Sequence, residues 1–507
     1  MKTIFLASAL IFATVCDASA VSLSLDECIV RALKENRSLK SVEMESAATA
    51  ESVPAARAAL LPSVRMRAFY TLVDRPGRLI IDKNTFGANL PSEDVDITTN
   101  DQDFYSLGLS VDQPVFTGGR LIHSFRKAKA ESAEAVLQEE SKREKLIFKV
   151  KQGFYDALNA RLQREIAEKV AEAKKERLRV LTELNLEGYI PREDVLRQDA
   201  DVAFAELEIT RGVNREQFAL SNLNQLINYT DQGDLQLHGM PGAVALVVSL
   251  EEVKRHAVAN AKELKVAGTR IKGAEEDISI ARSSYYPQIS VQGSYMRQRE
   301  TNITRDDVWL FTANLDWPIF EWGKTAAEVR QKAARKQKLQ YDHEESVLST
   351  SLEVERAWRR VRELEQALGA HEKRVRAVEY MAEQMGERHA EGTVKLAEVI
   401  EAESQFIREY NDYLAAANDL NSAVASLELA GSGVLSEWFE NKPLYIPPVN
   451  SHSSQLRTFV LAMGKPASKP LSSFSAQSQD DFTPSASEVV VHGLDSLDED
   501  ELEKLLQ

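Results

Sequence analysis

The clearest pattern along the chain is the alternation of apolar and polar residues in four short runs. The fourth run is the most regular, because every second residue is apolar at Trp309, Phe311, Ala313, Leu315 and Trp317. This period of two predicts a β-strand with one apolar face. A strand about 26 Å long, at roughly 3.3 Å per residue, with tryptophan at both ends is typical of one that crosses a lipid bilayer. Trp309 and Trp317 are therefore candidates for a membrane girdle.

The other three runs show the same alternation. Their apolar positions are Val64, Met66, Ala68 and Tyr70, then Leu107, Leu109 and Val111, and finally Ile289, Val291 and Tyr295. Two hairpins of a soluble sheet packed on a core would give the same pattern, because alternation is a weak signal in any single segment. Four strands cannot close a barrel, and lipid does not tolerate an open sheet edge. If these strands span a membrane, several chains share one barrel, twelve strands from three chains or eight from two.

A long helical pattern follows the second and the fourth of these runs. From about residue 119 to 187, and again from about 323 to 391, no proline interrupts and apolar residues recur at three- and four-residue steps. At 1.5 Å per residue each stretch is a rod of roughly 100 Å, which predicts a coiled coil or a helical barrel. Each rod ends at a glycine and a further helix follows, to about residue 227 and about residue 429, so each pair forms a helical hairpin.

A short motif joins each strand to its rod. It reads Pro-Val-Phe-Thr-Gly-Gly-Arg in the first half of the chain and Pro-Ile-Phe-Glu-Trp-Gly-Lys in the second. We expect the proline to stop the strand and the glycine to allow the sharp turn into the helix. The residues predicted to define these turns are Pro114, Phe116 and Gly119, and Pro318, Phe320 and Gly323.

The two halves are copies of one unit. Pro318 lies 204 residues after Pro114, and this offset holds to the ends of the rods. Capping-box patterns at Ser24 and Ser249 lie 225 residues apart, and each predicts the start of a helix, running to about residue 60 and about residue 285. The difference places 21 extra residues in the first half, in a polar, turn-rich loop from about residue 75 to 100. The chain is a tandem duplication.

The ends of the chain complete the predicted organisation. Residues 1–20 resemble a cleavable signal peptide, and Cys16 follows Val15 rather than a small residue, so we expect no lipoprotein. The first repeat is predicted at 21–242, the second at 243–432, and a serine-rich, largely disordered periplasmic tail at 433–507. No other stretch is long and apolar enough for a transmembrane helix. The net charge of -16 argues against nucleic-acid binding.

The signal peptide, the duplicated order of elements and the twin motif together resemble the TolC-like outer-membrane factors. This resemblance covers roughly residues 22 to 432. It implies a mainly helical fold with a small β part, in which long antiparallel hairpins form a periplasmic α-barrel and four strands per chain join a trimeric twelve-stranded barrel. It further implies an outer-membrane duct, for small molecules or secreted proteins, that works with a periplasmic adaptor and an inner-membrane RND or ABC transporter. A soluble periplasmic coiled-coil protein is the alternative.

The resemblance also assigns candidate sites near the hairpin turns. Gly188, Tyr189, Gly392 and Thr393 fall where the family's hairpin tips meet the adaptor, although a helix C-cap alone would also explain both glycines. Three further residues fall near the periplasmic entrance: Glu398, Glu401 and His389.

In a trimer the two glutamates would form rings of three carboxylates that favour cations. A solvated helix face is the simpler explanation of both. His389 and Val394 stand where studied members carry a gating tyrosine and arginine, so that gating network is in doubt here. His389 could add pH dependence or be idle. No nucleophile–base set, phosphate loop or metal-spaced Cys/His cluster is present in the sequence, so we expect no enzyme activity, cofactor or metal.

Overall fold

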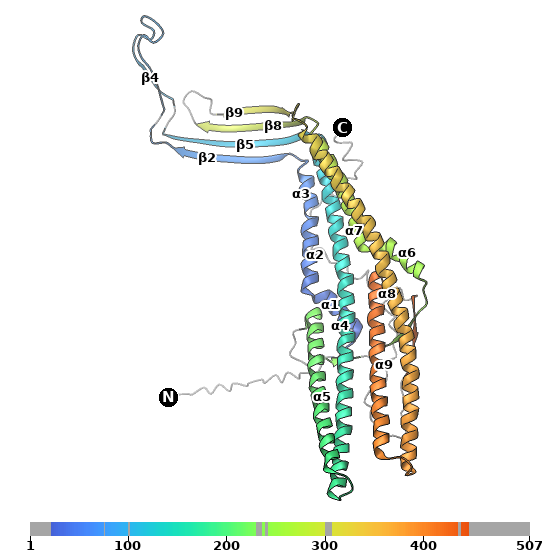
Figure 1. Ribbon diagram of the computed structural model, residues 1–507. Coiled ribbons are helices and arrows are strands. Elements are labelled where there is room, and N and C mark those ends of the chain that lie inside the picture. The colour runs from blue at the N-terminus through green and yellow to red at the C-terminus, as the bar shows by residue number, and fades with distance from the viewer. Residues whose placement is uncertain are drawn as a thin grey trace, which may run out of the picture. The chain divides into compact units, whose positions relative to one another are not determined.

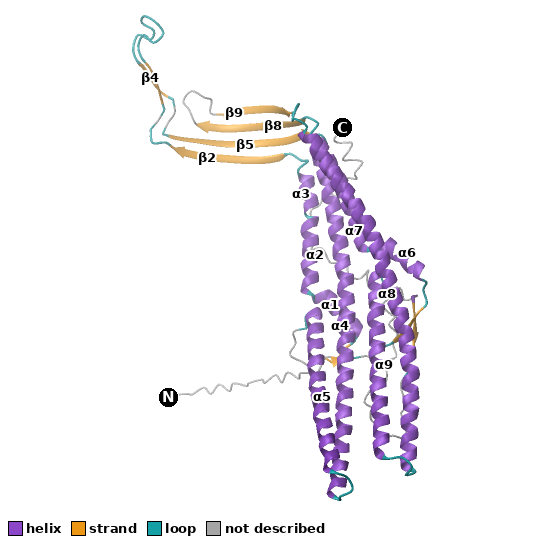
Figure 2. Ribbon diagram, viewed as in Figure 1, coloured by secondary structure: helices purple, strands orange, loops and turns teal. Residues whose placement is uncertain are grey.

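Two long helical hairpins and a four-stranded sheet make up most of the fold (Figures 1 and 2). The computed structural model describes residues 22–75, 77–99, 102–229, 236–238, 242–299, 307–433 and 438–445. The predicted signal peptide, and the predicted tail from residue 446 on, lie outside these residues.

The predicted rods and hairpins are present. Helices α4 (Arg120–Leu186) and α5 (Arg192–Ile227) form the first hairpin, and α8 (Lys324–Ala390) and α9 (Leu396–Ala430) form the second. Both α4 and α8 are 67 residues long, which agrees with a duplication. Apolar residues at helical spacing fill two separate cores. The first includes Val150, Phe154, Leu158, Leu223 and Ile227, and the second includes Val361, Phe406, Tyr410, Leu414 and Leu420.

The helices that open each half are interrupted, so the prediction of one continuous helix in each was wrong. The first is divided into α1 (Leu25–Glu35), α2 (Arg37–Ala50) and α3 (Ser52–Ala58), and the second into α6 (Leu250–Asn260) and α7 (Lys262–Ser283).

The break before α2 has a clear cause in Asn36. Its side chain accepts a hydrogen bond from the Leu39 N–H at 3.0 Å and donates one to the Leu226 carbonyl at 2.8 Å. An asparagine that caps a new helix and binds the end of α5 stabilises the interruption. The predicted capping boxes at Ser24 and Ser249 are both formed.

The four predicted strands form one antiparallel sheet in the order β2-β5-β8-β9. They are β2 (Ser63–Leu72), β5 (Asp103–Phe116), β8 (Gln288–Arg299) and β9 (Asp307–Asp316). Ser63 lies opposite Asp112, and their counterparts Gln288 and Asp316 lie opposite each other. The two halves therefore share one strand register. Among the strands that the structure describes, β2 and β9 each pair on one side only.

The segment predicted as a loop between β2 and β5 holds a short hairpin. Its strands are β3 (Arg78–Ile81) and β4 (Val95–Thr98), and Arg78 forms an ion pair with Asp96 across them. Leu79, Ile80 and Ile97 supply the β-forming side chains that the polar composition of the segment concealed.

The C-terminal boundary also needs correction, because residues 438–445 pack on the second repeat instead of opening a disordered tail. Strand β10 (Phe439–Lys442) pairs with β7 (Ala243–Leu246), and the side chain of Trp438 is buried. In addition, β1 (Ser22–Leu23) pairs with β6 (Gln236–Leu237). Burial of aromatic area stabilises the return of the chain, a tertiary effect that composition does not show.

Tyr445 holds the end of this returning segment against the second hairpin. Its hydroxyl donates to Glu379 Oε2 at 2.5 Å, its N–H donates to the Tyr413 hydroxyl at 2.8 Å, and the Arg376 guanidinium lies 4.2 Å from its ring centre. Burial raises the pKa of the Glu379 carboxyl above its ordinary value. The carboxyl is therefore easier to keep protonated when the chain is folded than when it is unfolded.

Replacing Glu379 with glutamine is expected to make the stability of the protein less dependent on pH. A carboxyl whose folded pKa is raised favours the folded state most at acidic pH, and this contribution is lost as pH rises through the folded pKa. Thermal unfolding in acidic and in neutral buffer measures the difference. The wild type should lose more stability than Glu379→Gln on going to neutral pH, and an equal loss would contradict the assignment.

Candidate functional site

The strand-to-helix turns differ in detail from the prediction. Gly119 and Gly323 cap α4 and α8 with φ of 84° and 83°, a left-handed conformation that favours glycine. Pro114 does not stop its strand, however, because β5 runs on to Phe116 with a register shift against β8. An irregularity of this kind accommodates a proline in a strand. In the second half β9 ends before Pro318.

Sequence reasoning missed the residue before each capping glycine. Gly118 has φ of 61°, and a Cβ there would lie 2.6 Å from the Ser283 carbonyl oxygen and 2.9 Å from the Tyr286 Cβ. Its counterpart is Trp322, with φ of 52° and a side chain 90% exposed. The first turn therefore requires glycine for space as well as for conformation. The offset of 204 residues could have drawn attention to this pair.

Each hairpin tip ends its long helix in a Schellman motif. At the first tip the Gly188 N–H donates to the Asn185 carbonyl at 3.0 Å and the Tyr189 N–H to the Leu184 carbonyl at 2.9 Å. At the second tip Gly392 and Thr393 make the same pair of bonds, at 2.8 and 3.0 Å. Both glycines have φ near 80°, as this motif requires. The predicted tip residues are thus the ones that turn the chain.

At each tip, one side chain forms a hydrogen bond to a backbone carbonyl on the other side of the turn. The amide of Asn185 donates to the Ile190 carbonyl at 2.7 Å, and His389 Nδ1, 2.8 Å from the Val394 carbonyl, makes the same contact as donor. Asn185 and His389 are 204 residues apart, so the contact is repeated. His389, selected as an entrance residue, holds the turn in this structure. The role of Asn185 cannot be predicted from the sequence, because the Ile190 carbonyl comes within reach only in the turn.

Replacing Asn185 with alanine is expected to loosen the first tip and leave the second unchanged. Loss of one hydrogen bond from a turn costs on the order of 1 kcal/mol. Amide hydrogen exchange at the two tips measures the effect, with His389→Ala as the converse variant. Exchange should rise by roughly five-fold at the tip that carries the substitution, since 1.4 kcal/mol is a factor of ten. Unchanged amide exchange at both tips in both variants would show that these hydrogen bonds do not stabilise the turns.

The two entrance glutamates lie near the start of α9. Glu398 is exposed in the first turn, and Glu401 is exposed one turn further on. Arg408 lies 3.2 Å from the Glu401 carboxylate, with side chains 62% and 74% exposed. An ion pair this exposed contributes little to stability. It does place a positive charge beside one of the two carboxylates, a neighbour that the spacing of the glutamates alone does not predict.

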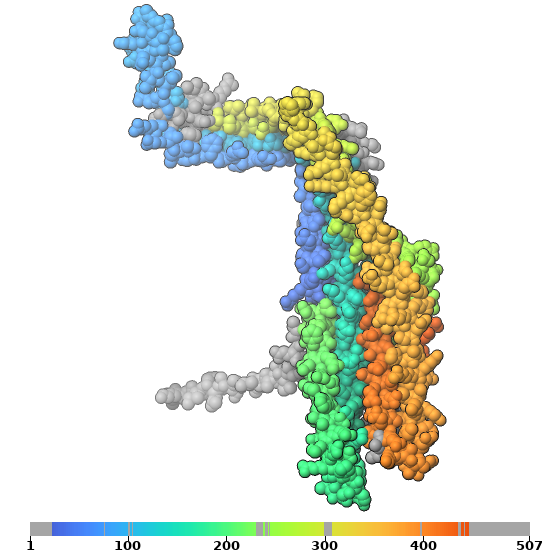
Figure 3. All heavy atoms as spheres, in the orientation of Figure 1, coloured from blue at the N-terminus to red at the C-terminus, as the bar shows by residue number. Residues whose placement is uncertain are grey.

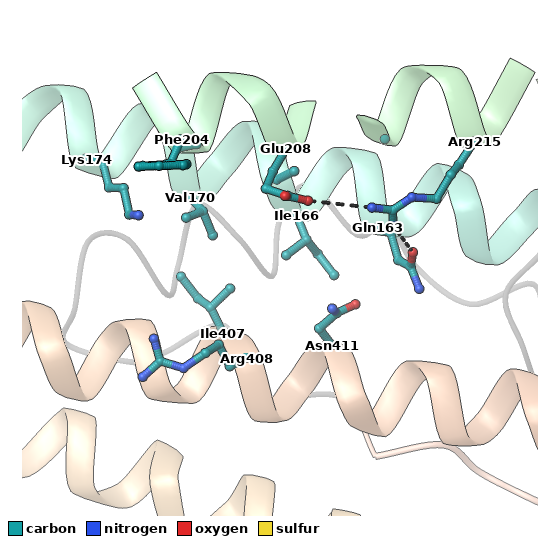
Figure 4. A pocket seen from close by; sticks show the side chains of 13 residues that line it. Gln163, Ile166, Val170, Lys174, Phe204, Glu208, Arg215, Ile407, Arg408 and Asn411 are labelled. Carbon is teal, nitrogen blue, oxygen red and sulfur yellow. Dashed lines mark hydrogen bonds and ion pairs between the residues drawn. The ribbon is translucent and has the colours of Figure 1, made fainter. Parts of the chain in front are cut away.

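Arg408 also lines a groove between the first hairpin and α9 (Figure 4). The first hairpin and α9 lie side by side (Figure 3). The groove encloses about 290 Å³, and its apolar lining includes Ile166, Val170, Phe204 and Ile407. On one side Arg215 donates to the Gln163 amide oxygen at 3.0 Å and lies 3.5 Å from Glu208 (Figure 4). These residues form a polar and apolar surface without a nucleophile paired to a base.

The register of the sheet places most of its exposed apolar residues on one face. Val64 lies opposite Val111, Leu109 opposite Tyr295, and Tyr295 opposite Trp309. The exposed members of this face include Val64, Met66, Tyr70, Leu107, Leu109, Val111, Val291, Trp309, Phe311 and Leu315. Trp317 follows β9 and donates from Nε1 to the Tyr285 carbonyl at 3.2 Å, at the helical end of the sheet. A continuous apolar face of this size indicates contact with a non-aqueous partner.

The described residues contain no group of three or more His, Cys, Asp or Glu side chains placed to hold a metal ion. None of the helices resolved there has the length and apolar character needed to cross a membrane.

The family of this chain follows from a match along both halves of the duplication. A family model described as outer membrane efflux protein matches residues 28–229 and 254–431, which is most of the chain. The chain belongs to the outer membrane efflux protein family, and the resemblance to TolC-like outer-membrane factors is confirmed. The family is one of outer membrane channels rather than enzymes.

Individual relatives agree with this assignment. The pyoverdine export outer membrane protein OpmQ of Pseudomonas aeruginosa is 23% identical over 384 residues, covering 75% of this chain and 78% of that protein. The CmeC outer membrane channel of Campylobacter jejuni has a TM-score of 0.66 at 16% identity, covering 81% of this chain and 85% of that one. The open-state MtrE channel of Neisseria gonorrhoeae has a TM-score of 0.64 at 20% identity, covering 81% and 89%. The predicted fold class is therefore confirmed.

Proposed function

We propose that this protein is a trimeric duct through which small molecules or proteins leave the cell across the outer membrane. The apolar face of the sheet, set by the strand register, is the observation that carries the proposal. Strands β2 and β9 each have one unpaired edge among the described strands, and lipid does not tolerate open edges. Three copies joined edge to edge would give twelve strands, and the helical hairpins would continue the passage into the periplasm.

The alternative, a soluble periplasmic coiled coil, fits the exposed face less well. Phe311, Met66 and Trp309 are 78%, 71% and 69% exposed. A water-soluble sheet normally buries such residues on a core, whereas a lipid-facing sheet exposes them to the bilayer. The export role also requires the predicted signal peptide at residues 1–20.

In this proposal the tips of the hairpins receive a periplasmic adaptor that links the duct to an inner-membrane transporter. Tyr189 and Leu186 at the first tip are 74% and 82% exposed, so they offer apolar area to a partner. At Gly188 and Gly392 an added Cβ would meet nothing within 4 Å, so these glycines leave the tip surfaces open. Binding of the adaptor there would spread the helix ends and open the passage.

Replacing Glu398 and Glu401 with glutamine is expected to reduce the preference of the channel for cations. In a trimer each position supplies three carboxylates, and rings of carboxylates select cations at a constriction. The Arg408→Gln variant is the matched control, because it removes the positive charge 3.2 Å from Glu401 and should shift the preference the opposite way. Reversal potentials in a potassium chloride gradient measure both shifts. Equal potentials for all three proteins would exclude the carboxylates from the constriction.

A further inference from the structure

Helix α8 has an uncovered face that its counterpart α4 lacks. Helix α4 packs against the pair α2 and α3 and also against α7. Helix α8 packs against α7, but among the described residues no other helix covers α8 in the way that α7 covers α4 (Figure 1). Tyr341, Leu348 and Leu352 on α8 are 60%, 66% and 59% exposed. Their counterparts in α4, 204 residues earlier, are partly buried. The missing neighbour of α8 should therefore correspond to α7.

The duplication identifies the segment that corresponds to α7. Helix α7 begins at Lys262 and ends at Ser283, and the same positions 225 residues earlier are Arg37 and Ala58, the bounds of α2 and α3 together. Within one chain, α2 and α3 already pack on α4. The segment that covers α8 must then come from a second copy of the chain.

Polar contacts between α4 and α7 show which residues would meet. Glu134 accepts from Arg270 at 2.7 Å, Ser141 donates to Glu263 at 2.9 Å, and Glu140 forms an ion pair with Lys262. The counterparts of these pairs are Lys338 with Glu45, Glu345 with Ser38, and Glu344 with Arg37. Every pair is again complementary, and all six counterparts are exposed.

The α4–α7 pairs and their counterparts on α8 and α2 differ in which helix carries the positive charge. Glu344 and Arg37 keep the sign of their counterparts, whereas Lys338 and Glu45 reverse it. Three other polar contacts of α4 with α7 have counterparts that lack a charge pair: His123 with Glu276, Lys127 with Asp277, and Lys145 with Glu263. The complementary counterparts are thus confined to residues 338–345 of α8.

We propose that residues 338–345 of α8 bind α2 of a second copy of this chain, pairing Lys338 with Glu45, Glu344 with Arg37 and Glu345 with Ser38. Lys338 also contacts Asp342 at 2.6 Å, and an ammonium group has donors for both carboxylates. The proposal rests on the trimeric duct and specifies how its copies recognise one another. Head-to-tail contacts of this kind close into a ring when the rotation between copies closes, as it does in the proposed trimer.

The reversed pair discriminates between the correct and the wrong neighbour. If α2 took the place of α7 on α4, Glu45 would face Glu134. If α7 took the place of α2 on α8, Arg270 would face Lys338. Like charges disfavour both exchanges, so the reversal separates packing within a chain from packing between chains. The same offsets of 204 and 225 residues pair β9 with β2 of the next copy. Asp316 and Arg67, the counterparts of Asp112 and Gln292, would then lie opposite each other, as Asp112 and Gln292 do within the chain.

Cross-linking in detergent of the mature protein, which lacks Cys16 because residues 1–20 are predicted to be cleaved, tests the proposed register. Cysteines replace Ser38 and Glu345 together, and a short bis-maleimide is added; the native Cys28 is fully buried and out of its reach. Covalent dimers and trimers are expected on a denaturing gel. The matched control moves the first cysteine to Thr49, about 16 Å further along the segment at 1.5 Å per residue, and should give little product. Equal products from both variants, or none from either, would overturn the register.

Charge reversal tests the discrimination. Lys338→Glu and Glu45→Lys each place like charges together at all three interfaces, so each should lower the temperature at which the trimer dissociates. The double variant should restore more than half of the loss. A stable trimer in which the double variant is no better than the singles would refute the pairing and leave the duct intact. A wild-type protein that is monomeric in detergent would instead refute the proposed function.

Discussion

Replacing Phe311 with arginine is expected to prevent stable insertion of the protein into the outer membrane. Phe311 lies near the middle of β9 on the apolar face and is 78% exposed. An arginine on the lipid face near the bilayer centre costs about 2–4 kcal/mol, which becomes about 6–12 kcal/mol over three copies. The Phe311→Arg protein should be depleted from outer-membrane fractions and lose its trimer on detergent extraction.

The next residue along the strand provides the control. Thr312 lies opposite Gln292, on the polar face of the sheet, so its side chain points away from Phe311. The Thr312→Arg variant carries the same added charge and should still insert and form trimers. If both variants insert equally well, the apolar face does not contact lipid. If both fail, the charge disrupts folding of β9 and not its contact with the membrane.

Replacing Gly118 with alanine is expected to destabilise the junction between the sheet and α4 by about 2–5 kcal/mol. The new Cβ would lie 2.6 Å from the Ser283 carbonyl oxygen, and the backbone φ of 61° is unfavourable for alanine. Neither the carbonyl nor the adjoining Cβ of Tyr286 can rotate away, so the helix end must shift. Thermal dissociation of the trimer in detergent measures the loss.

A substitution at Gly323 separates the two causes of the expected loss of stability, the steric collision and the unfavourable backbone φ. It also has a positive φ, of 83°, but an added Cβ there would meet nothing within 4 Å in the chain. The Gly323→Ala variant therefore carries the conformational penalty without the collision, and its loss should be smaller by about 1–3 kcal/mol. Equal losses in the two variants would show that Gly118 is required for its backbone conformation alone.

Features that repeat over many residues could be predicted from the sequence. Both 67-residue helices, the four strands and the duplication follow from long periodic patterns. Interruptions of a helix that depend on a single tertiary contact could not be predicted from the sequence. The break at Asn36 depends on the Leu226 carbonyl, which is 190 positions away in the chain. The return of Trp438 and Tyr445 to the second hairpin depends on partners that composition does not reveal.

Some residues of the candidate sites could likewise be predicted from the sequence, and others could not because they depend on tertiary contacts. The glycines of the tips could be recognised because a left-handed helix end restricts the choice of residue. The contact between His389 and Val394 could not, because it forms only when the turn brings the side chain back to that carbonyl. The requirement for Gly118 depends on the end of α7, more than 160 residues later in the chain. The ion pair of Glu401 with Arg408 depends on side-chain conformations that the helical spacing alone does not fix.

Single-channel recording from the purified mature protein in a planar bilayer, with its mass determined in detergent, tests the proposed function most directly. The duct predicts a trimer that inserts and conducts, with a preference for cations that falls when Glu398 and Glu401 are neutralised. A protein that remains monomeric or dimeric in buffer without detergent, and gives no conductance in the bilayer, would contradict it.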